Sequence, residues 1–202
     1  MAEKNLYIIS GCNGAGKTTA SYSVLPKLLD CKQFVNADEI AKGLSPFCPE
    51  SVAIQAGKLM LLRIEELLAT DETFSIETTL ATRSYSELVK RAQEKGYKVT
   101  LLYFWLNSPE LAVERVARRV REGGHNIPKD VIYRRYKKGL KNLFNIFIPI
   151  VDSWIIVDNG VEPREVIAEG GINEINICCV EKFEKIRNHE KQSDIRKNKS
   201  RS

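Results

Sequence analysis

Gly11-Cys12-Asn13-Gly14-Ala15-Gly16-Lys17-Thr18 is the stretch that decides the fold of this 202-residue chain. It fits the pattern G-x-x-x-x-G-K-[ST], and it lies between the apolar run Asn5–Ser10 and a segment of helical character, Thr18–Leu29. Glycines let the backbone wrap closely around a phosphate, and the free amides and dipole of a helix start attract an anion. We therefore predict a nucleotide-binding loop from Gly11 to Thr19, with Lys17 at the β and γ phosphates and the Thr18 hydroxyl as a Mg²⁺ ligand.

Strand-like and helix-like segments alternate along the rest of the chain. The expected strands are Asn5–Ser10, Gln33–Ala37, Thr73–Glu77, Lys98–Leu106 and Trp154–Val157, with Ile175–Val180 as a candidate sixth. The expected helices are Thr18–Leu29, Pro49–Leu68, Ser84–Lys95, Ser108–Glu122 and Pro128–Phe144. This alternation predicts the α/β class, with a P-loop NTPase fold built on a mainly parallel sheet of five to six strands that has helices on both faces.

The length favours one domain at residues 1–180, followed by a basic helix or partly disordered tail at 181–202. The net charge is +5, and residues 181–202, with eight basic and four acidic side chains, carry +4 of it. The remaining 180 residues carry only +1, so the predicted domain gives no electrostatic case for a nucleic-acid partner. The chain has no apolar run of the ~18 residues that a membrane span needs and no recognisable secretory signal, so we expect a cytoplasmic location without membrane contact.

The cysteines and histidines point away from metal binding. The five cysteines are odd in number and show no C-x-x-C spacing, so we interpret them as small, half-buried apolar side chains rather than a zinc site or a disulfide framework. His125 lies in a glycine-containing turn and is interpreted as a local hydrogen-bonding residue.

Two carboxylates follow expected strands. Asp38 comes directly after Gln33–Ala37, and Glu77 ends the strand before Thr78. The carboxyl ends of parallel strands open onto one crevice, so we predict Asp38 as the general base and Glu77 as a residue that binds the acceptor or a Mg²⁺ water. Thr78 and Arg83 are placed on the acceptor side with Glu77. On local sequence, an Asp38 that only caps a short helix at 39–42 is supported equally well, and the alternative for Glu77 is an exposed strand end. The phosphate loop earlier in the chain favours a functional role for both.

Arginines concentrate on the two later helices. Within Ser108–Glu122, Arg121 lies nearest the apolar face and stands beside a Gly-Gly hinge, whereas Arg115 and Arg119 point well away from that face. Arg134 follows on the next helix. We predict that Arg121 and Arg134 close over the phosphates as a lid, and we assign Arg115 and Arg119 to a solvated helix face.

The chain resembles the zeta toxin-like P-loop kinases, in particular their short bacterial chromosomal branch. The resemblance covers roughly Asn5 to Asn159 and is carried by GCNGAGKTT, NADEIA, FSIETTLATRSY and FWLNSPELAVERVARRVREGGHNIPKDVIYRRYKKGLKNL. One departure is Cys12, where such loops usually have proline, and a thiol there would make the site sensitive to oxidation.

The resemblance implies a kinase that uses ATP or GTP as the phosphate donor and a small-molecule acceptor, UDP-N-acetylglucosamine, phosphorylated on a sugar hydroxyl. It also implies an antitoxin partner that covers the nucleotide site. By motif, Lys17 carries over as the phosphate lysine, Asp38 as the base, Glu77 as the acceptor-side carboxylate, and Arg121 and Arg134 as the clamp.

Two alternatives remain open on the sequence. The first is a kinase of another small molecule or of a nucleic-acid end, in which the basic tail would take part. A steep salt dependence of oligonucleotide binding would mark that case. The second is a nucleotide-binding module of a toxin–antitoxin pair with little turnover, which would show no phosphate transfer to any pool of acceptors.

Overall fold

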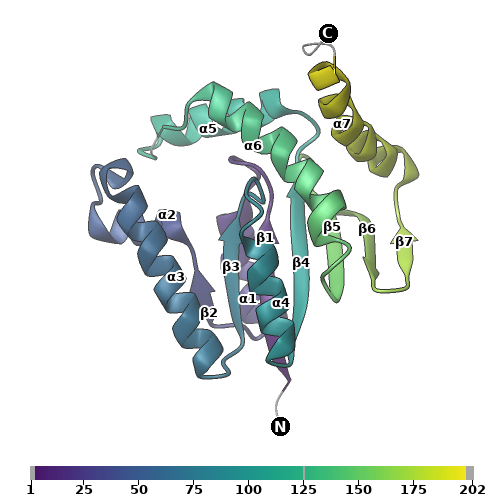
Figure 1. Cartoon of the computed structure of the whole chain (residues 1–202). Coiled ribbons are helices and arrows are strands. Elements are labelled where there is room, and N and C mark those ends of the chain that lie inside the picture. Colours follow the sequence, from purple (N-terminus) through teal and green to yellow (C-terminus); the bar gives the residue numbers. More distant parts are fainter. Residues whose placement is uncertain (1–2, 125, 199–202) are drawn as a thin grey trace.

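A computed structural model describes residues 3–124 and 126–198, so the expectation for His125 and the outermost parts of residues 1–180 and 181–202 lie outside it. Within the described residues, one seven-stranded sheet has the order β2-β3-β1-β4-β5-β6-β7 (Figure 1). The strands are β1 Lys4–Ser10, β2 Gln33–Val35, β3 Phe74–Thr78, β4 Tyr97–Trp105, β5 Ser153–Asp158, β6 Glu165–Gly171 and β7 Ile175–Ile177.

Helices cover both faces of this sheet and its carboxyl end. α3 and α4 lie on the face turned to the viewer in Figure 1, α1 lies on the opposite face, and α5 and α6 arch over the upper end of the strands. The helical segments are α1 Lys17–Leu28, α2 Ala37–Leu44, the 3₁₀ turn η1 Pro49–Val52, α3 Ala53–Ala69, α4 Tyr85–Glu94, α5 Pro109–Arg121, α6 Lys129–Asn142, the π-helical turn η2 Leu143–Phe147 and α7 Val180–Asn198.

The central strands are held by apolar burial on both faces. β1 pairs in parallel with β3 on one side and with β4 on the other. Leu6, Ile8 and Leu101 have no exposed surface, and Trp154 on β5 is also buried. A strand covered on both sides reads as a continuous apolar run, which is why β1 and β4 were recognisable in the sequence. The phosphate loop follows β1, so the most deeply buried part of the sheet supports it.

The predicted fold class is confirmed, and the sheet carries one strand more than expected. β2, β3, β1, β4 and β5 are parallel, whereas β6 and β7 form an antiparallel extension beside β5. The candidate sixth strand appears as β7. The strand missed by the prediction is β6, whose sequence EVIAEGG has two charged residues and two glycines and lacks an apolar alternation.

Two helices differ from their expected form. The segment expected as Pro128–Phe144 ends its α-helical part at Asn142 and continues as η2, and the segment expected as Pro49–Leu68 opens with η1. The short helix expected at 39–42 is α2, which begins at Ala37.

The C-terminal helix α7 packs on the body of the protein. Ile186 is fully buried, Phe183 stacks edge-on against Phe144, and the Arg187 guanidinium lies 4.8 Å from the centre of the Phe144 ring. The division of the chain into a domain at residues 1–180 and a tail at residues 181–202 stays a prediction. The first half of residues 181–202 nevertheless contributes to the core through Ile186.

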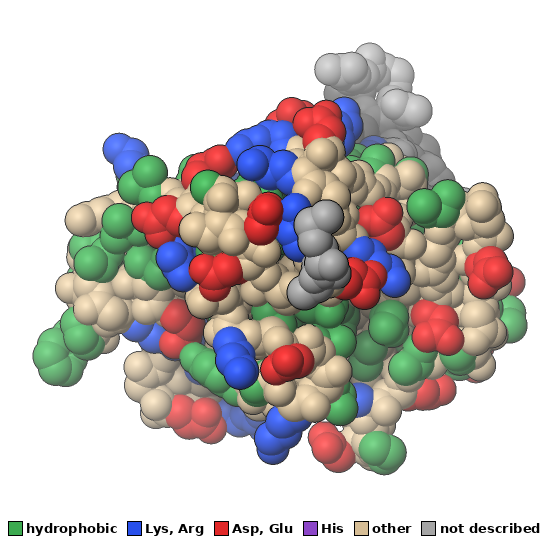
Figure 2. All heavy atoms as spheres, turned by 90° about the horizontal axis from the view of Figure 1, so that it is seen from below, with side chains coloured by type: hydrophobic (Ala, Val, Ile, Leu, Met, Phe, Trp, Pro, Cys, Tyr) green, Lys and Arg blue, Asp and Glu red, His purple; other side chains and the backbone are tan. Residues whose placement is uncertain are grey.

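The described residues can be compared with two expectations, one about contact with a membrane and one about binding of nucleic acid. No helix within residues 3–124 and 126–198 combines the length and apolar character that a membrane crossing requires. At the amino ends of the parallel strands, basic and acidic side chains are interspersed among the residues drawn in colour (Figure 2). That face therefore offers no broad basic surface of the kind that binds nucleic acid.

Candidate active site

Glycine is required where the phosphate loop touches its neighbours. Gly11 has φ 139°, and a Cβ there would lie 2.3 Å from the carbonyl oxygen of Phe104 on β4. Gly14 has φ 78°, and its Cβ would lie 2.8 Å from the carbonyl oxygen of Ala112 on α5. L-residues rarely adopt these angles, so the loop is held in a shape that only glycine permits. Free amides at the start of a helix such as α1 favour binding of an anion.

Lys17 is buried within this loop. It is the first residue of α1, and its Nζ donates to the Cys12 carbonyl oxygen at 3.1 Å. The same Nζ lies 3.5 Å from Glu77 Oε1, with both side chains less than a tenth exposed. A buried charge needs a partner, and Glu77 supplies one. The ammonium group thus lies at the loop, and its place at the β and γ phosphates stays a prediction.

Glu77 is brought to the loop by strand register. The parallel pairing of Ile9 with Glu77 and of Ser10 with Thr78 aligns the ends of β1 and β3. Glu77 Oε2 accepts from Thr18 Oγ1 at 2.8 Å and from Asn36 Nδ2 at 2.9 Å. A hydroxyl and a carboxylate at this spacing are the hard oxygen donors that Mg²⁺ prefers, so the residues present fit that ion. Thr18 and Glu77 are the side chains that would hold it.

Asp38 does not cap α2. The N-cap is Asn36, whose Oδ1 accepts from the backbone amides of Asp38 at 2.8 Å and Glu39 at 3.4 Å. The interpretation of Asp38 as a helix cap is therefore wrong, because the cap lies two residues earlier. The Asp38 carboxylate is exposed in the first turn of α2, where the helix dipole favours a negative charge. Its assignment as the base stays a prediction.

The other acceptor-side residues follow β3. Thr78 Oγ1 accepts from the Leu80 amide at 3.1 Å and so supports the turn at Leu80, which has φ 53°. Arg83 is exposed just before α4. Neither residue contacts Glu77 through a hydrogen bond recorded among the described residues, so their place on the acceptor side stays a prediction.

The arginines near the loop are not the two that were expected. Arg135 Nη1 donates to Asn13 Oδ1 at 3.1 Å, and Arg115 Nη1 donates to the Asn159 carbonyl oxygen at 2.9 Å. The assignment of Arg115 to a solvated face is wrong, because α5 turns this side toward the loop as it passes Gly14. Arg121 and Arg134 are both exposed, and their role as a clamp stays a prediction.

Asn159 is a residue of the site that the sequence did not reveal. It follows β5, and its Nδ2 donates to the Ala15 carbonyl oxygen at 2.6 Å. Its Oδ1 accepts from Arg164 Nε at 2.6 Å, and its amide donates to the Trp105 carbonyl oxygen at 3.0 Å. Every polar group of Asn159 is thus used to join the phosphate loop to β4, α5 and the chain after β5. Asparagine is common in the turns that follow strands, so this residue type does not by itself indicate a place in the site.

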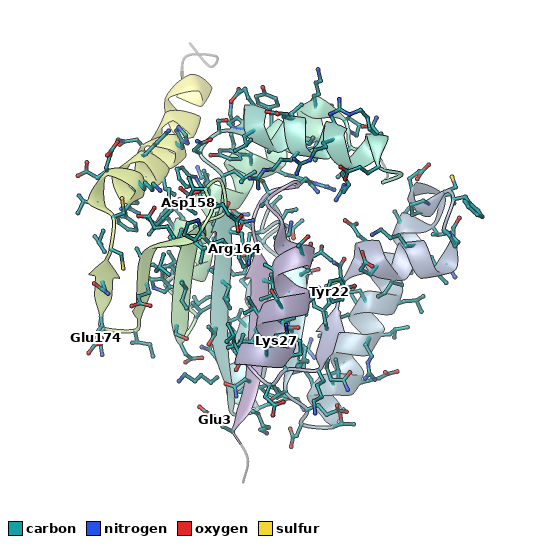
Figure 3. All side chains as sticks on the ribbon, turned by 180° about the vertical axis from the view of Figure 1, so that it is seen from behind. Glu3, Tyr22, Lys27, Asp158, Arg164 and Glu174 are labelled. Atoms are coloured by element: carbon teal, nitrogen blue, oxygen red, sulfur yellow. The ribbon has the colours of Figure 1, made fainter. Side chains whose placement is uncertain are left out.

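A buried ion pair supports the same corner. Asp158 is 2 % exposed, and it accepts from the Gly160 amide at 2.7 Å and from Lys182 Nζ on α7 at 2.8 Å. The hydrogen bond that Lys182 donates to Asp158 is the main cause that raises the pKa of Lys182, and the bond that it donates to Glu165 adds to it. Figure 3 shows Asp158 and Arg164 between α7 and the start of α1. The C-terminal helix is thereby linked to the segment that holds the phosphate loop.

We expect Asn159→Ala to weaken ATP binding about fivefold, since one hydrogen bond contributes about 1 kcal/mol and its loss leaves the Ala15 carbonyl unsupported. Calorimetric titration of the variant with MgATP measures the change. Arg164→Ala is the matched control, because it removes only the exposed partner of Asn159 and should change the affinity less than twofold. Equal affinities for the wild type and Asn159→Ala would contradict a role in the loop.

Cys12 is shielded rather than reactive. Its side chain is 2 % exposed, and burial raises the pKa of its thiol to about 11 despite the opposing charges of Lys17 and Arg115. The thiolate is the species that oxidants and alkylating agents attack, and at neutral pH Cys12 holds its proton. The structure therefore argues against the expected sensitivity of the loop to oxidation.

Comparison with known proteins adds one family and several related folds. The model of the AAA domain family matches residues 6–142. A protein of Haemophilus influenzae, described as uncharacterized, is 31 % identical over an alignment of 145 residues that covers 67 % of this chain and the whole of that protein.

Solved structures share the fold at low sequence identity. A chain of the AvrRxo1-ORF1:AvrRxo1-ORF2 complex with sulphate ions has a TM-score of 0.75 at 19 % identity over 92 % of this chain, and the same complex with ATP has a TM-score of 0.73. This chain spans 64 % of the length of that relative. A chain of the PezAT chromosomal toxin–antitoxin system of Streptococcus pneumoniae has a TM-score of 0.67 at 17 % identity, covering 96 % of this chain and 87 % of its own.

Proposed function

Because this chain belongs to the AAA domain family, we propose that it is an ATP-dependent phosphotransferase that phosphorylates a hydroxyl group of a small molecule. The family match and the fold shared with the PezAT structure confirm the resemblance to zeta toxin-like P-loop kinases at the level of family and fold. The observation that carries the proposal is the cluster of Lys17, Thr18 and Glu77, with Asp38 on the neighbouring helix. A phosphate loop alone binds nucleotide, whereas an exposed carboxylate on the helix whose cap bonds to Glu77 supports the proposal of an acceptor.

The proposed reaction is a direct transfer from ATP to the acceptor. The acceptor hydroxyl oxygen forms a bond to the γ-phosphorus, the bond from that phosphorus to the β–γ bridging oxygen breaks, and ADP leaves. The hydroxyl proton passes to the Asp38 carboxylate. Lys17 and the amides at the start of α1 stabilise the negative charge on the phosphates. A Mg²⁺ held by Thr18 and Glu77 would supply further neutralisation of that charge.

UDP-N-acetylglucosamine is the acceptor that we propose, on the strength of the resemblance to the zeta toxin-like kinases. An antitoxin that covers the nucleotide site is the corresponding partner. The PezAT structure, described as a toxin–antitoxin system, supports the proposal of such a partner. Part of the basic C-terminal segment is occupied in packing, since Lys182 pairs with Asp158 and Arg187 lies on Phe144. This reduces the charge that the segment could offer to a nucleic-acid acceptor.

Incubation with γ-labelled MgATP tests the proposal. We expect label to move to UDP-N-acetylglucosamine when that sugar nucleotide is added, and mass spectrometry should show one added phosphate. A parallel incubation with a metabolite extract identifies any other acceptor. Label found on a different small molecule would overturn the sugar-nucleotide acceptor and keep the reaction class. No transfer to any acceptor, with nucleotide still bound, would overturn the reaction class and favour the binding module.

A further inference from the structure

Asn36 lies at the junction of β2 and α2 and uses both ends of its side-chain amide. Its Oδ1 caps α2 by accepting from the Asp38 and Glu39 amides, and its Nδ2 donates to Glu77 Oε2 at 2.9 Å. The residue is 5 % exposed, so water does not compete freely for these bonds. One buried side chain therefore touches both the helix that carries Asp38 and the carboxylate beside the phosphate loop.

Strand register explains why the amide reaches Glu77. β2 is an edge strand of three residues, and its pairing with β3 ends at Val35 opposite Ile76. Asn36 directly follows β2, and Glu77 directly follows Ile76 on β3. The two residues therefore lie side by side just beyond the last backbone pair of these strands. The side-chain bond between them extends the contact of the strands by one residue, up to the edge where the site lies.

The chemistry of an amide suits this position. Glu77 Oε2 receives Thr18 Oγ1 and Asn36 Nδ2, and Oε1 faces the Lys17 ammonium group. A neutral donor fixes the orientation of the carboxylate and leaves its negative charge in place. A lysine or an arginine at position 36 would cancel that charge. An aspartate or a serine could cap α2 equally well, but neither could donate to Glu77 across the same distance.

We propose that Asn36 is a positioning residue that holds Glu77 and the Asp38-bearing start of α2 in one fixed arrangement. This inference rests on the proposed phosphotransfer, in which Asp38 takes the proton of the acceptor and Glu77 would hold Mg²⁺ beside the phosphates. A misplacement of about 1 Å between reacting groups can lower a rate by about 100-fold. The cap and the bond to Glu77 are separate functions of the same amide, and substitutions can separate them.

Asn36→Asp and Asn36→Ser provide that separation. Asn36→Asp keeps the shape and the capping oxygen, removes the donor and places a second negative charge beside Glu77. Asn36→Ser keeps a capping oxygen without adding charge, and its side chain is too short to reach Glu77. We expect kcat to fall about 100-fold in Asn36→Asp and about tenfold in Asn36→Ser. The KM for ATP should stay within threefold of the wild type, because Asn36 does not touch the phosphate loop.

Thermal melting and a control on the same helix exclude a simple loss of structure. Asn36→Ser should melt within a few degrees of the wild type, since Asn and Ser cap helices about equally, whereas Asn36→Asp should melt lower because its charge lies beside Glu77 at a buried position. Lys42→Ala removes the Lys42–Glu39 pair on the exposed side of α2 and should leave kcat unchanged. Turnover within threefold of the wild type in both Asn36 variants is the pattern of a residue that only caps, and it would overturn the proposal.

Crystal structures of the wild type and of Asn36→Asp give a readout that does not depend on activity. We expect the Glu77 carboxylate to turn away from position 36 in the variant, while the aspartate still accepts from the amides at the start of α2. An unmoved Glu77 would overturn the positioning role even if turnover falls. If the wild-type protein transfers no phosphate, the proposed function fails, and the two structures alone decide the role of Asn36.

Discussion

Replacing Lys17 with alanine should lower kcat/KM for ATP-dependent transfer by about 1000-fold, at the upper end of what one phosphate-stabilising group contributes. The side chain is 6 % exposed, and its Nζ bonds to the Cys12 carbonyl oxygen within the phosphate loop. The substitution also leaves Glu77 without its positive partner, which makes the site repel a triphosphate. Steady-state kinetics together with MgATP titration measure both effects.

Lys27→Ala is the matched control for Lys17→Ala. Lys27 lies in the last turn of the same helix and is exposed, and Figure 3 shows it far down α1 from the loop. It has the same charge, so its loss changes the net charge of the protein equally. We expect its kinetics to match the wild type. If the Lys17→Ala protein binds and consumes MgATP as the wild type does, the phosphate loop takes no part in the reaction.

Asp38→Asn should lower kcat by about 1000-fold and leave the affinity for MgATP within threefold. General base catalysis contributes roughly 100- to 10,000-fold, and an amide of the same shape cannot take the proton. Helix α2 should keep its start, because Asn36 and not Asp38 is the cap. Only the favourable interaction of the charge with the helix dipole is lost, about 0.3–1 kcal/mol at an exposed position. Single-turnover transfer and calorimetry separate the two quantities.

Glu39→Gln tests whether any loss of charge at the start of α2 has the same effect. Glu39 is the next residue along the helix and pairs with Lys42 on the outer side. Its substitution should leave kcat within twofold of the wild type. If Asp38→Asn retains full transfer, the base is another group, and the exposed carboxylate at position 38 serves only the helix dipole.

Two of the strands that the sequence predicted, β1 and β4, have an apolar signal on both faces. β1 and β4 are buried on both sides and therefore read as continuous apolar runs. β6 lies beyond β5 near the edge of the sheet, and its first two residues are exposed. β6 is a strand because it pairs with β5 on one side and β7 on the other. The composition of its seven residues does not by itself indicate a strand.

The arginines show the limit of a helical wheel. A helical wheel favours Arg121 because this residue lies nearest to the apolar face of α5. The wheel describes only how the helix packs against the sheet. The amino-terminal half of α5 instead passes the phosphate loop, where Gly14 leaves room for the Ala112 carbonyl and the Arg115 side chain. The position of α5 relative to the loop, rather than its own periodicity, decides which arginine reaches the site.

The sequence by itself determined the phosphate loop and the strand-loop-helix unit around it. These depend on residues within a short stretch, where glycines permit the backbone angles and an ammonium group follows at a set distance. Only the tertiary structure decided that Arg135 and Asn159 contact this loop, that Arg115 bonds to Asn159 and that Asn36 bonds to Glu77. The bond between Asn159 and Ala15 joins residues 144 positions apart in the chain. Such contacts arise from strand register and helix packing, which bring together positions whose own residue types give no sign of it.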